Sequence, residues 1–248
     1  MNPTQLTALP PLSLYIHIPW CLQKCPYCDF NSHTIKTTLD EDAYVQALLT
    51  DLQHELPHFW GRGIETIFIG GGTPSVFSVS AIDRLLSGIR ALVKLNPEAE
   101  ITLEANPGTF DHDKFQGFRS AGINRLSIGV QSFDEQRLLF LKRRHTAQQA
   151  RDAITILQDA GIKNISIDLI FGLPGQQLTD WKWELEQAFQ LPVAHLSAYS
   201  LMYEEGTPLY YARQRGIVQE CDDETSLAMF QSLTQHAKAA GFEQYEIS

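Results

Sequence analysis

Six short apolar runs, each followed by a longer segment with the spacing of an amphipathic helix, divide the 248-residue chain. Such runs between helices are typical of strands in a parallel sheet that helices cover. The predicted strands are residues 12–18, 65–69, 101–107, 125–131, 164–170 and 195–201. Six strand–helix units fit either a doubly wound α/β sheet or an open, partial (β/α) barrel, and the pattern alone does not choose between them.

Residues at the ends of four intervening segments support their assignment as helices. Acidic residues fill the first turn of a helix that begins near residue 40, as the helix dipole favours. Thr146 and Gly161 are typical cap residues for a helix between them, and Gly241 ends the last helix. The predicted helices begin near residue 40 and span residues 78–94, 146–161 and 222–240.

Three of the four cysteines lie within eight residues, in Cys21-Leu-Gln-Lys-Cys25-Pro-Tyr-Cys28, directly after the first predicted strand. Thiolates bind soft metals, and three on one loop can enclose a metal centre. Structural zinc sites usually use two separated ligand pairs, whereas three thiolates suit a [4Fe–4S] cluster with one iron open to another ligand. A zinc site with a distant fourth ligand and a disulfide with a spare thiol are the alternatives. Cys221, far along the chain, is interpreted as an incidental thiol.

Polar residues inside or after the other predicted strands form a second set of candidates. Gly70, Gly71, Gly72 and Thr73 follow the second strand, where glycine lets a ligand approach the backbone or simply permits a tight turn. Three further polar residues sit in otherwise apolar strands: Glu104, Gln131 and Asp168. A carboxylate there requires a partner, which is a buried salt bridge, an arginine or a ligand hydroxyl.

The Cys-x3-Cys-x2-Cys spacing, preceded by Tyr15-Ile-His-Ile-Pro19 and followed by Asp29-Phe30, resembles the radical S-adenosylmethionine (SAM) enzymes. It is most similar to the branch that contains oxygen-independent coproporphyrinogen III oxidase and the haem chaperones. The resemblance continues through Gly-Gly-Thr-Pro74, Glu104-Ala-Asn-Pro107 and Asp168-Leu-Ile-Phe-Gly-Leu-Pro174, and covers residues 12–248.

The resemblance implies a partial TIM-type barrel of six units. It also implies a [4Fe–4S] cluster held by Cys21, Cys25 and Cys28, with SAM on the fourth iron. One electron from a donor of the flavodoxin or ferredoxin type would cleave SAM to methionine and a 5′-deoxyadenosyl radical. The implied SAM-site residues are Tyr15, Tyr27, Gly71, Gly72, Thr73, Glu104, Gln131, Arg143 and Asp168, with Met202 a weaker match and Phe30 beside the adenine or the cluster.

Three departures from the family pattern bear on function. The oxidases carry a further cysteine two residues after the third, where this chain has Phe30. This difference favours a haem chaperone, which binds haem and passes it to acceptor proteins. An oxidase that decarboxylates coproporphyrinogen III is the second hypothesis, and a zinc-stabilised binding protein is the third. Lys142 stands where the family often has glycine before Arg143 and His145. A His-Asn-x-x-Tyr-Trp haem-binding motif is expected downstream of Ser248.

Composition and the chain ends limit the other classes of function. The net charge is -10, which argues against nucleic acid as the main partner, and hydrophobic residues make up 44%, enough for a substantial core. No apolar run reaches the roughly 18 residues that a transmembrane helix requires, and the N-terminus does not resemble a signal peptide, so a reducing, cytoplasmic location is expected. We expect residues 1–11 to form a flexible tail and residues 12–248 to form the core domain. The family pattern implies that this domain has a further C-terminal portion.

Overall fold

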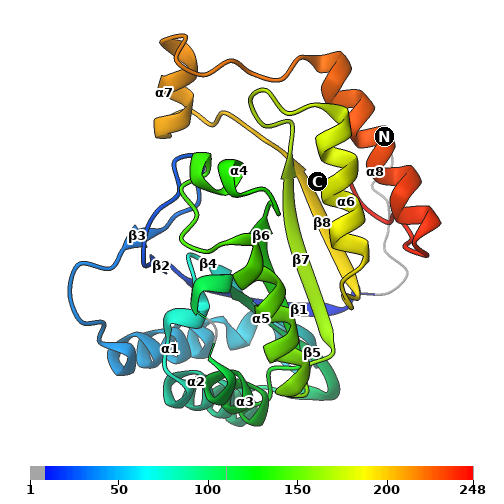
Figure 1. Cartoon of the computed structure of the whole chain (residues 1–248). Coiled ribbons are helices and arrows are strands. Elements are labelled where there is room, and N and C mark those ends of the chain that lie inside the picture. Colours follow the sequence, from blue (N-terminus) through cyan, green and yellow to red (C-terminus); the bar gives the residue numbers. More distant parts are fainter. Residues whose placement is uncertain (1–8, 110, 248) are drawn as a thin grey trace, which may run out of the picture.

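The computed structural model describes residues 9–109 and 111–247. Six strands form one parallel sheet with the sequential order β1-β4-β5-β6-β7-β8. A doubly wound sheet would reverse its strand order at a switch point, whereas sequential parallel winding generates a barrel. The chain therefore forms an open, partial α/β barrel (Figure 1), and the expected tail residues 1–8 lie outside the described residues.

The predicted strands are confirmed, several with longer bounds. The six strands are β1 Leu12–Ile18, β4 Ile64–Gly71, β5 Leu95–Ala105, β6 Arg125–Gln131, β7 Asn164–Phe171 and β8 His195–Ser200. Two further short strands pair only with each other: β2 Trp20–Cys21 and β3 His33–Thr34.

Helices connect the strands and cover one face of the sheet (Figure 1). The α-helices are α1 Glu41–Phe59, α2 Val79–Leu92, α3 His112–Ala121, α4 Glu135–Phe140, α5 Ala147–Asp159, α6 Leu178–Phe189, α7 Pro208–Gln214 and α8 Asp223–Ala239, and the 3-10 helices are η1 Pro74–Val76 and η2 Pro107–Thr109. Side-chain oxygens cap several of them at the N-terminus, as Ser78 does for α2 and Thr146 for α5. No helix in the described ranges is both long and apolar enough to cross a membrane.

The hydrophobic core lies between the sheet and these helices. Side chains alternate along a strand, so Ile16 and Ile18 of β1 are buried while Tyr15 and His17 point to the opposite, concave face. Phe77, Phe118 and Trp181 fill the helix side of the core and are almost completely buried. This arrangement leaves the concave face free for polar residues.

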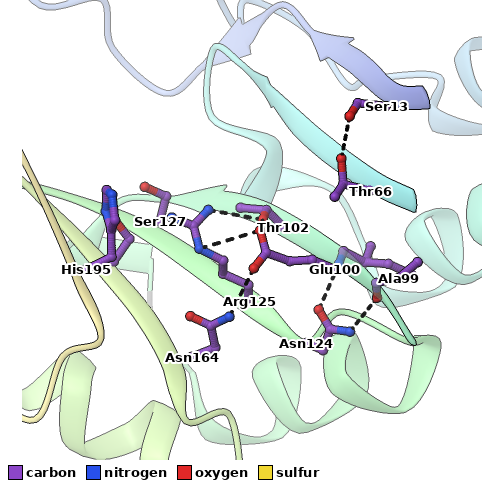
Figure 2. A network of polar contacts seen from close by, with 12 residues as sticks. Ser13, Thr66, Ala99, Glu100, Thr102, Asn124, Arg125, Ser127, Asn164 and His195 are labelled. Carbon is purple, nitrogen blue, oxygen red and sulfur yellow. Dashed lines mark hydrogen bonds and ion pairs between the residues drawn. The ribbon is translucent and has the colours of Figure 1, made fainter. Parts of the chain in front are cut away.

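A polar network occupies the concave face at the N-terminal ends of the strands (Figure 2). Arg125 of β6 pairs with Glu100 of β5 at 3.8 Å and donates to Thr102 Oγ1 at 3.2 Å, and Asn164 of β7 also donates to Glu100. These contacts tie three neighbouring strands together through side chains. In barrels of this class the N-terminal face serves stability and the C-terminal face carries the chemistry.

Candidate functional site

A cavity of about 430 Å³ lies at the C-terminal ends of the strands, the size of a small-molecule site. All the site residues that the family resemblance implies line it except Tyr15, and of the glycine candidates only Gly70 lies outside its lining. The predicted residues that it brings together are Cys21, Cys25, Tyr27, Cys28, Gly71, Gly72, Thr73, Glu104, Gln131, Arg143, Asp168 and Met202. They come from several parts of the chain that the parallel winding places at one end of the barrel.

The cysteine loop is fastened at its base by main-chain hydrogen bonds. The N–H of His33 donates to Pro19 O at 2.6 Å and that of Ile35 donates to Cys21 O at 2.9 Å, which closes the loop where β2 pairs with β3. At the tip, the N–H of Leu209 in the first turn of α7 donates to Pro26 O at 2.9 Å. The segment that carries the three thiols is therefore held at both its base and its tip.

The glycine loop after β4 packs directly against the cysteine loop. The N–H groups of Gly72 and Thr73 donate to Ile18 O at 2.8 Å and Trp20 O at 2.7 Å. A Cβ on Gly72 would lie 2.6 Å from Trp20 O, and Gly71 has a φ of +113°, so only glycine fits this close approach. The same geometry turns the unblocked backbone of Gly71 towards the cavity.

Two carboxyl groups face the cavity from the concave side of the sheet. The N–H of Gly71 donates to Glu104 at 3.1 Å, and the hydroxyl of Ser127 donates to Asp168 at 3.3 Å. Burial, followed by the charge of Asp168, raises the pKa of Glu104 to about 7. Burial also raises the pKa of Asp168 to about 6, although Ser127, Ser197 and nearby arginines oppose it. No described residue forms an ion pair with Glu104, so a cationic or hydroxyl-bearing ligand is its natural partner.

Arg143 connects the cysteine loop to the sheet. Its guanidinium donates to Cys25 Sγ at 3.4 Å, to Gly129 O at 2.6 Å and to Asn106 Oδ1. Asn106 in turn donates to Thr73 Oγ1 at 3.0 Å. Arg143, which the family resemblance implies for the SAM site, is thus part of a network that spans the cysteine loop, the glycine loop and β6.

Lys142, which replaces the family's glycine, adopts the left-handed conformation that glycine favours. Its φ is +53°, and its N–H donates to Leu139 O at 3.0 Å while that of Arg143 donates to Leu138 O at 2.9 Å. This pair of bonds is the Schellman arrangement that ends a helix, here α4. The turn therefore forms without the glycine and still directs Arg143 into the site.

Gln131 at the end of β6 also has a left-handed backbone, with a φ of +69°. The two residues that follow are held by Glu184 of α6, a carboxylate that is only 1% exposed. Glu184 accepts hydrogen bonds from the hydroxyl of Ser132 and from the N–H of Phe133, the latter at 2.7 Å. This buried contact fixes the turn that orients Gln131 towards the cavity.

The remaining predicted residues differ in their placement. Tyr15 is 56% exposed on the concave face and bonds His17 at 2.9 Å, outside the lining of the cavity. Tyr27 lies beside Cys25 and Arg143, whereas Met202 and Phe30 stand at the rim with 63% and 58% exposure. Several further lining residues were not predicted, among them Asn106, Ser127, Gly129 and Tyr199. Asn106 could have been found, because it directly follows β5 and stands two residues after Glu104.

The donor set of the cavity fits the cluster and SAM that the resemblance implies. Thiols line one part of the cavity, and two carboxyls, an arginine and open glycine backbone line the rest, which suits a ligand with an amino group, a carboxylate and hydroxyls. No three His, Cys, Asp or Glu side chains within the described part of the chain converge on a single ion. A four-iron cluster gives each thiolate its own iron, so its ligands stand further apart than those of a single metal ion.

Comparison with known proteins identifies the family. The model of the radical SAM superfamily matches residues 15–188. The chain is 48% identical over 98% of its length to the haem chaperone HemW of Escherichia coli and 45% identical over 97% to that of Haemophilus influenzae, and it spans 63% of each. The solved structure of coproporphyrinogen III oxidase (HemN) from Escherichia coli aligns with a TM-score of 0.82 and 29% identity, covering 94% of this chain and 54% of that one. The chain belongs to the radical SAM superfamily.

Proposed function

We propose that the chain is the radical SAM core of a haem chaperone, a protein that binds haem and transfers it to acceptor proteins. The observation that carries this is the 48% identity over 98% of the chain to a haem chaperone. Phe30 supports it, because it stands where the oxidases of the resembled branch carry a further cysteine. The chain spans about 63% of the curated relatives that it matches, so haem binding and transfer are proposed for the protein as a whole.

Different residues of the cavity would hold the cluster and the SAM that the superfamily implies. Cys21, Cys25 and Cys28 are the proposed cluster ligands. The backbone carbonyls of Gly71 and Gly72 and the carboxyl groups of Glu104 and Asp168 would hold the amino group and ribose hydroxyls of SAM, and Arg143 would screen negative charge near Cys25. With an electron, cluster and SAM together supply reductive cleavage of the sulfonium bond. The protein positions the reactants and excludes water.

The proposed partners are haem, haem-acceptor proteins and an electron donor of the flavodoxin or ferredoxin type. We infer a cytoplasmic location, because the thiolate ligands of a cluster need reducing conditions. The four cysteines are free thiols in the structure.

A second function is favoured by one structural observation. The alignment to coproporphyrinogen III oxidase has a TM-score of 0.82 over 94% of this chain. The alternative is therefore the oxidative decarboxylation of coproporphyrinogen III by the same cavity.

The two functions are separated by one anaerobic experiment on the 248-residue chain, with the Escherichia coli chaperone as the full-length reference. The cluster is reconstituted, iron and sulfide are measured, and the protein is incubated with reductant, SAM and coproporphyrinogen III. We expect no protoporphyrinogen by chromatography from the 248-residue chain, and we expect haem to pass to an apo-acceptor from the full-length reference in a parallel assay. Protoporphyrinogen formation would identify an oxidase. Zinc in place of iron would exclude both functions.

A further inference from the structure

A second, smaller cavity lies behind the cysteine loop. Its volume is about 130 Å³, and Cys25 and Arg143 line both cavities. Leu22 and Gln23 of the cysteine loop contribute to it, and the turn 142–145 forms its other wall. The Cys25 side chain thus lies between the cofactor cavity and an outer surface. From that surface a partner can reach a proposed cluster ligand without entering the space for SAM.

The outer surface is basic although the chain as a whole carries a charge of -10. Lys142, Arg143 and Arg144 line the small cavity, and no described carboxylate does. Arg143 is committed to Cys25, Gly129 and Asn106, but the side chains of Lys142 and Arg144 are exposed and form no ion pair within the described residues. Two uncompensated cations therefore stand beside the thiol of Cys25.

The backbone presents these two cations rigidly. Exposure alternates along the turn: Lys142 and Arg144 point outwards, Arg143 points to the site, and His145 is buried with its ring nitrogen 3.0 Å from Val130 O. The Schellman bonds of α4 and the capping box of α5, which begins at Thr146, fix the turn from both sides. The fixed turn keeps the Cα positions of both cations on the outer face, so binding a partner there requires ordering of their side chains only.

We propose that this face, defined by Leu22, Gln23, Lys142 and Arg144, docks an acidic one-electron donor protein that reduces the cluster through Cys25. The proposal rests on the proposed function, because it requires the cluster. SAM and substrate occupy the inner cavity during turnover, so an electron must arrive from the outer side. One electron passes from the reduced prosthetic group of the donor to the oxidised cluster, the donor is oxidised by one electron, and no bond forms or breaks. Opposite charges accelerate such encounters and orient the partners.

The test compares cluster reduction by reduced flavodoxin in the reconstituted wild type and in Lys142→Glu/Arg144→Glu, by stopped-flow absorbance at low ionic strength. Lys163→Glu/Lys182→Glu is the matched control, since these lysines are exposed and lie outside both cavities. We expect the second-order rate constant to fall about tenfold in the first variant and to be little changed in the control, with the difference shrinking as salt is added. Calorimetric titration with oxidised flavodoxin should show weaker binding to the first variant than to the wild type and the control.

A third variant and a second reductant separate failure of the docking surface from failure of the cluster. Lys142→Asn/Arg144→Gln removes the charges with a residue that tolerates the left-handed backbone, and should give an intermediate rate. Dithionite, a small reductant, should reduce all four proteins equally. A chain that dithionite cannot reduce has no competent cluster, which contradicts the proposed function and this surface with it. If dithionite reduces every protein and flavodoxin reduces the two charge-reversal variants at the same rate, the docking surface alone is contradicted.

Discussion

Glu104 on β5 and Asp168 on β7 face one cavity from either side of β6. Burial and then the charge of Asp168 raise the pKa of Glu104 from 4.5 to about 7, and burial raises that of Asp168 from 3.8 to about 6. The folded chain therefore keeps protons on these groups at pH values where the unfolded chain has released them. Stability without cofactors must fall as pH rises through this window.

Replacing Glu104 with glutamine should remove its part of this pH dependence. The amide oxygen can still accept from the N–H of Gly71, but it carries no charge. Glu104→Gln should gain stability relative to wild type as pH rises from about 4.5 to about 7. The gain should be on the order of 1 kcal/mol. Urea unfolding midpoints of the cofactor-free chain at the two ends of this range measure the effect. An equal difference at both ends would show that Glu104 titrates normally.

Removing one thiol of the cysteine loop should abolish the cluster. Cys25→Ala leaves two of the three proposed ligands, and the cluster's visible absorption should be lost after anaerobic reconstitution. Cys221→Ala is the matched control, because this cysteine lies outside the cofactor cavity and should leave the absorption unchanged. Full absorption in Cys25→Ala would exclude Cys25 as a ligand.

Glu184→Gln should weaken SAM binding although Glu184 does not line the cavity. The glutamine amide carries no charge and has one acceptor oxygen where the carboxylate has two, so it cannot accept from both Ser132 and Phe133 as strongly, which loosens the turn after Gln131. We expect the Kd for SAM to rise roughly 3- to 30-fold, because only part of the energy of a hydrogen bond to a charged group, about 1.5–3 kcal/mol, is transmitted through the turn to the cavity. The cluster absorption should stay intact. Glu186→Gln, exposed on the same helix, is the control. Equal SAM affinities would limit Glu184 to a role in stability.

Lys142→Gly should stabilise the chain. The φ of +53° costs a residue with a Cβ about 1 kcal/mol that glycine does not incur, part of which the greater freedom of unfolded glycine offsets. We expect an increase of up to about 1 kcal/mol, measured by thermal unfolding. Lys142→Ala removes the same charge but keeps the Cβ, so it should bring no gain. Equal effects of the two substitutions would assign the change to charge.

The strands and several helices could be predicted because their residues carry local signals. Thr146 and Ser78 are capping residues, and the strands contrast with their polar flanks. The bounds of helix α6 were not predicted, because Gln177 at its N-cap is not one of the usual capping residues, and the six-residue α4 is too short to show a helical period. The choice of a partial barrel depends on the order of the strands, which sequence periodicity does not contain.

Most of the cavity was predictable from residues at strand ends and from the family motifs. Tyr15 lies outside the lining of the cavity, and the sequence could not show this because alternation along a strand gives the face but not the distance to a site. The role of Glu184 could not be predicted, since its contact with Phe133 joins segments 51 residues apart. The burial of Arg143 likewise depends on Asn106 and Gly129, which only the folded sheet brings together.

The cysteine loop is held by main-chain bonds that do not involve the sulfur atoms: His33 to Pro19, Ile35 to Cys21 and Leu209 to Pro26. These bonds do not depend on what the thiols bind. A cluster bound at this site would therefore be lost to oxygen without loss of the loop's main-chain structure. Its replacement would require fresh iron and sulfide, and no refolding of the protein.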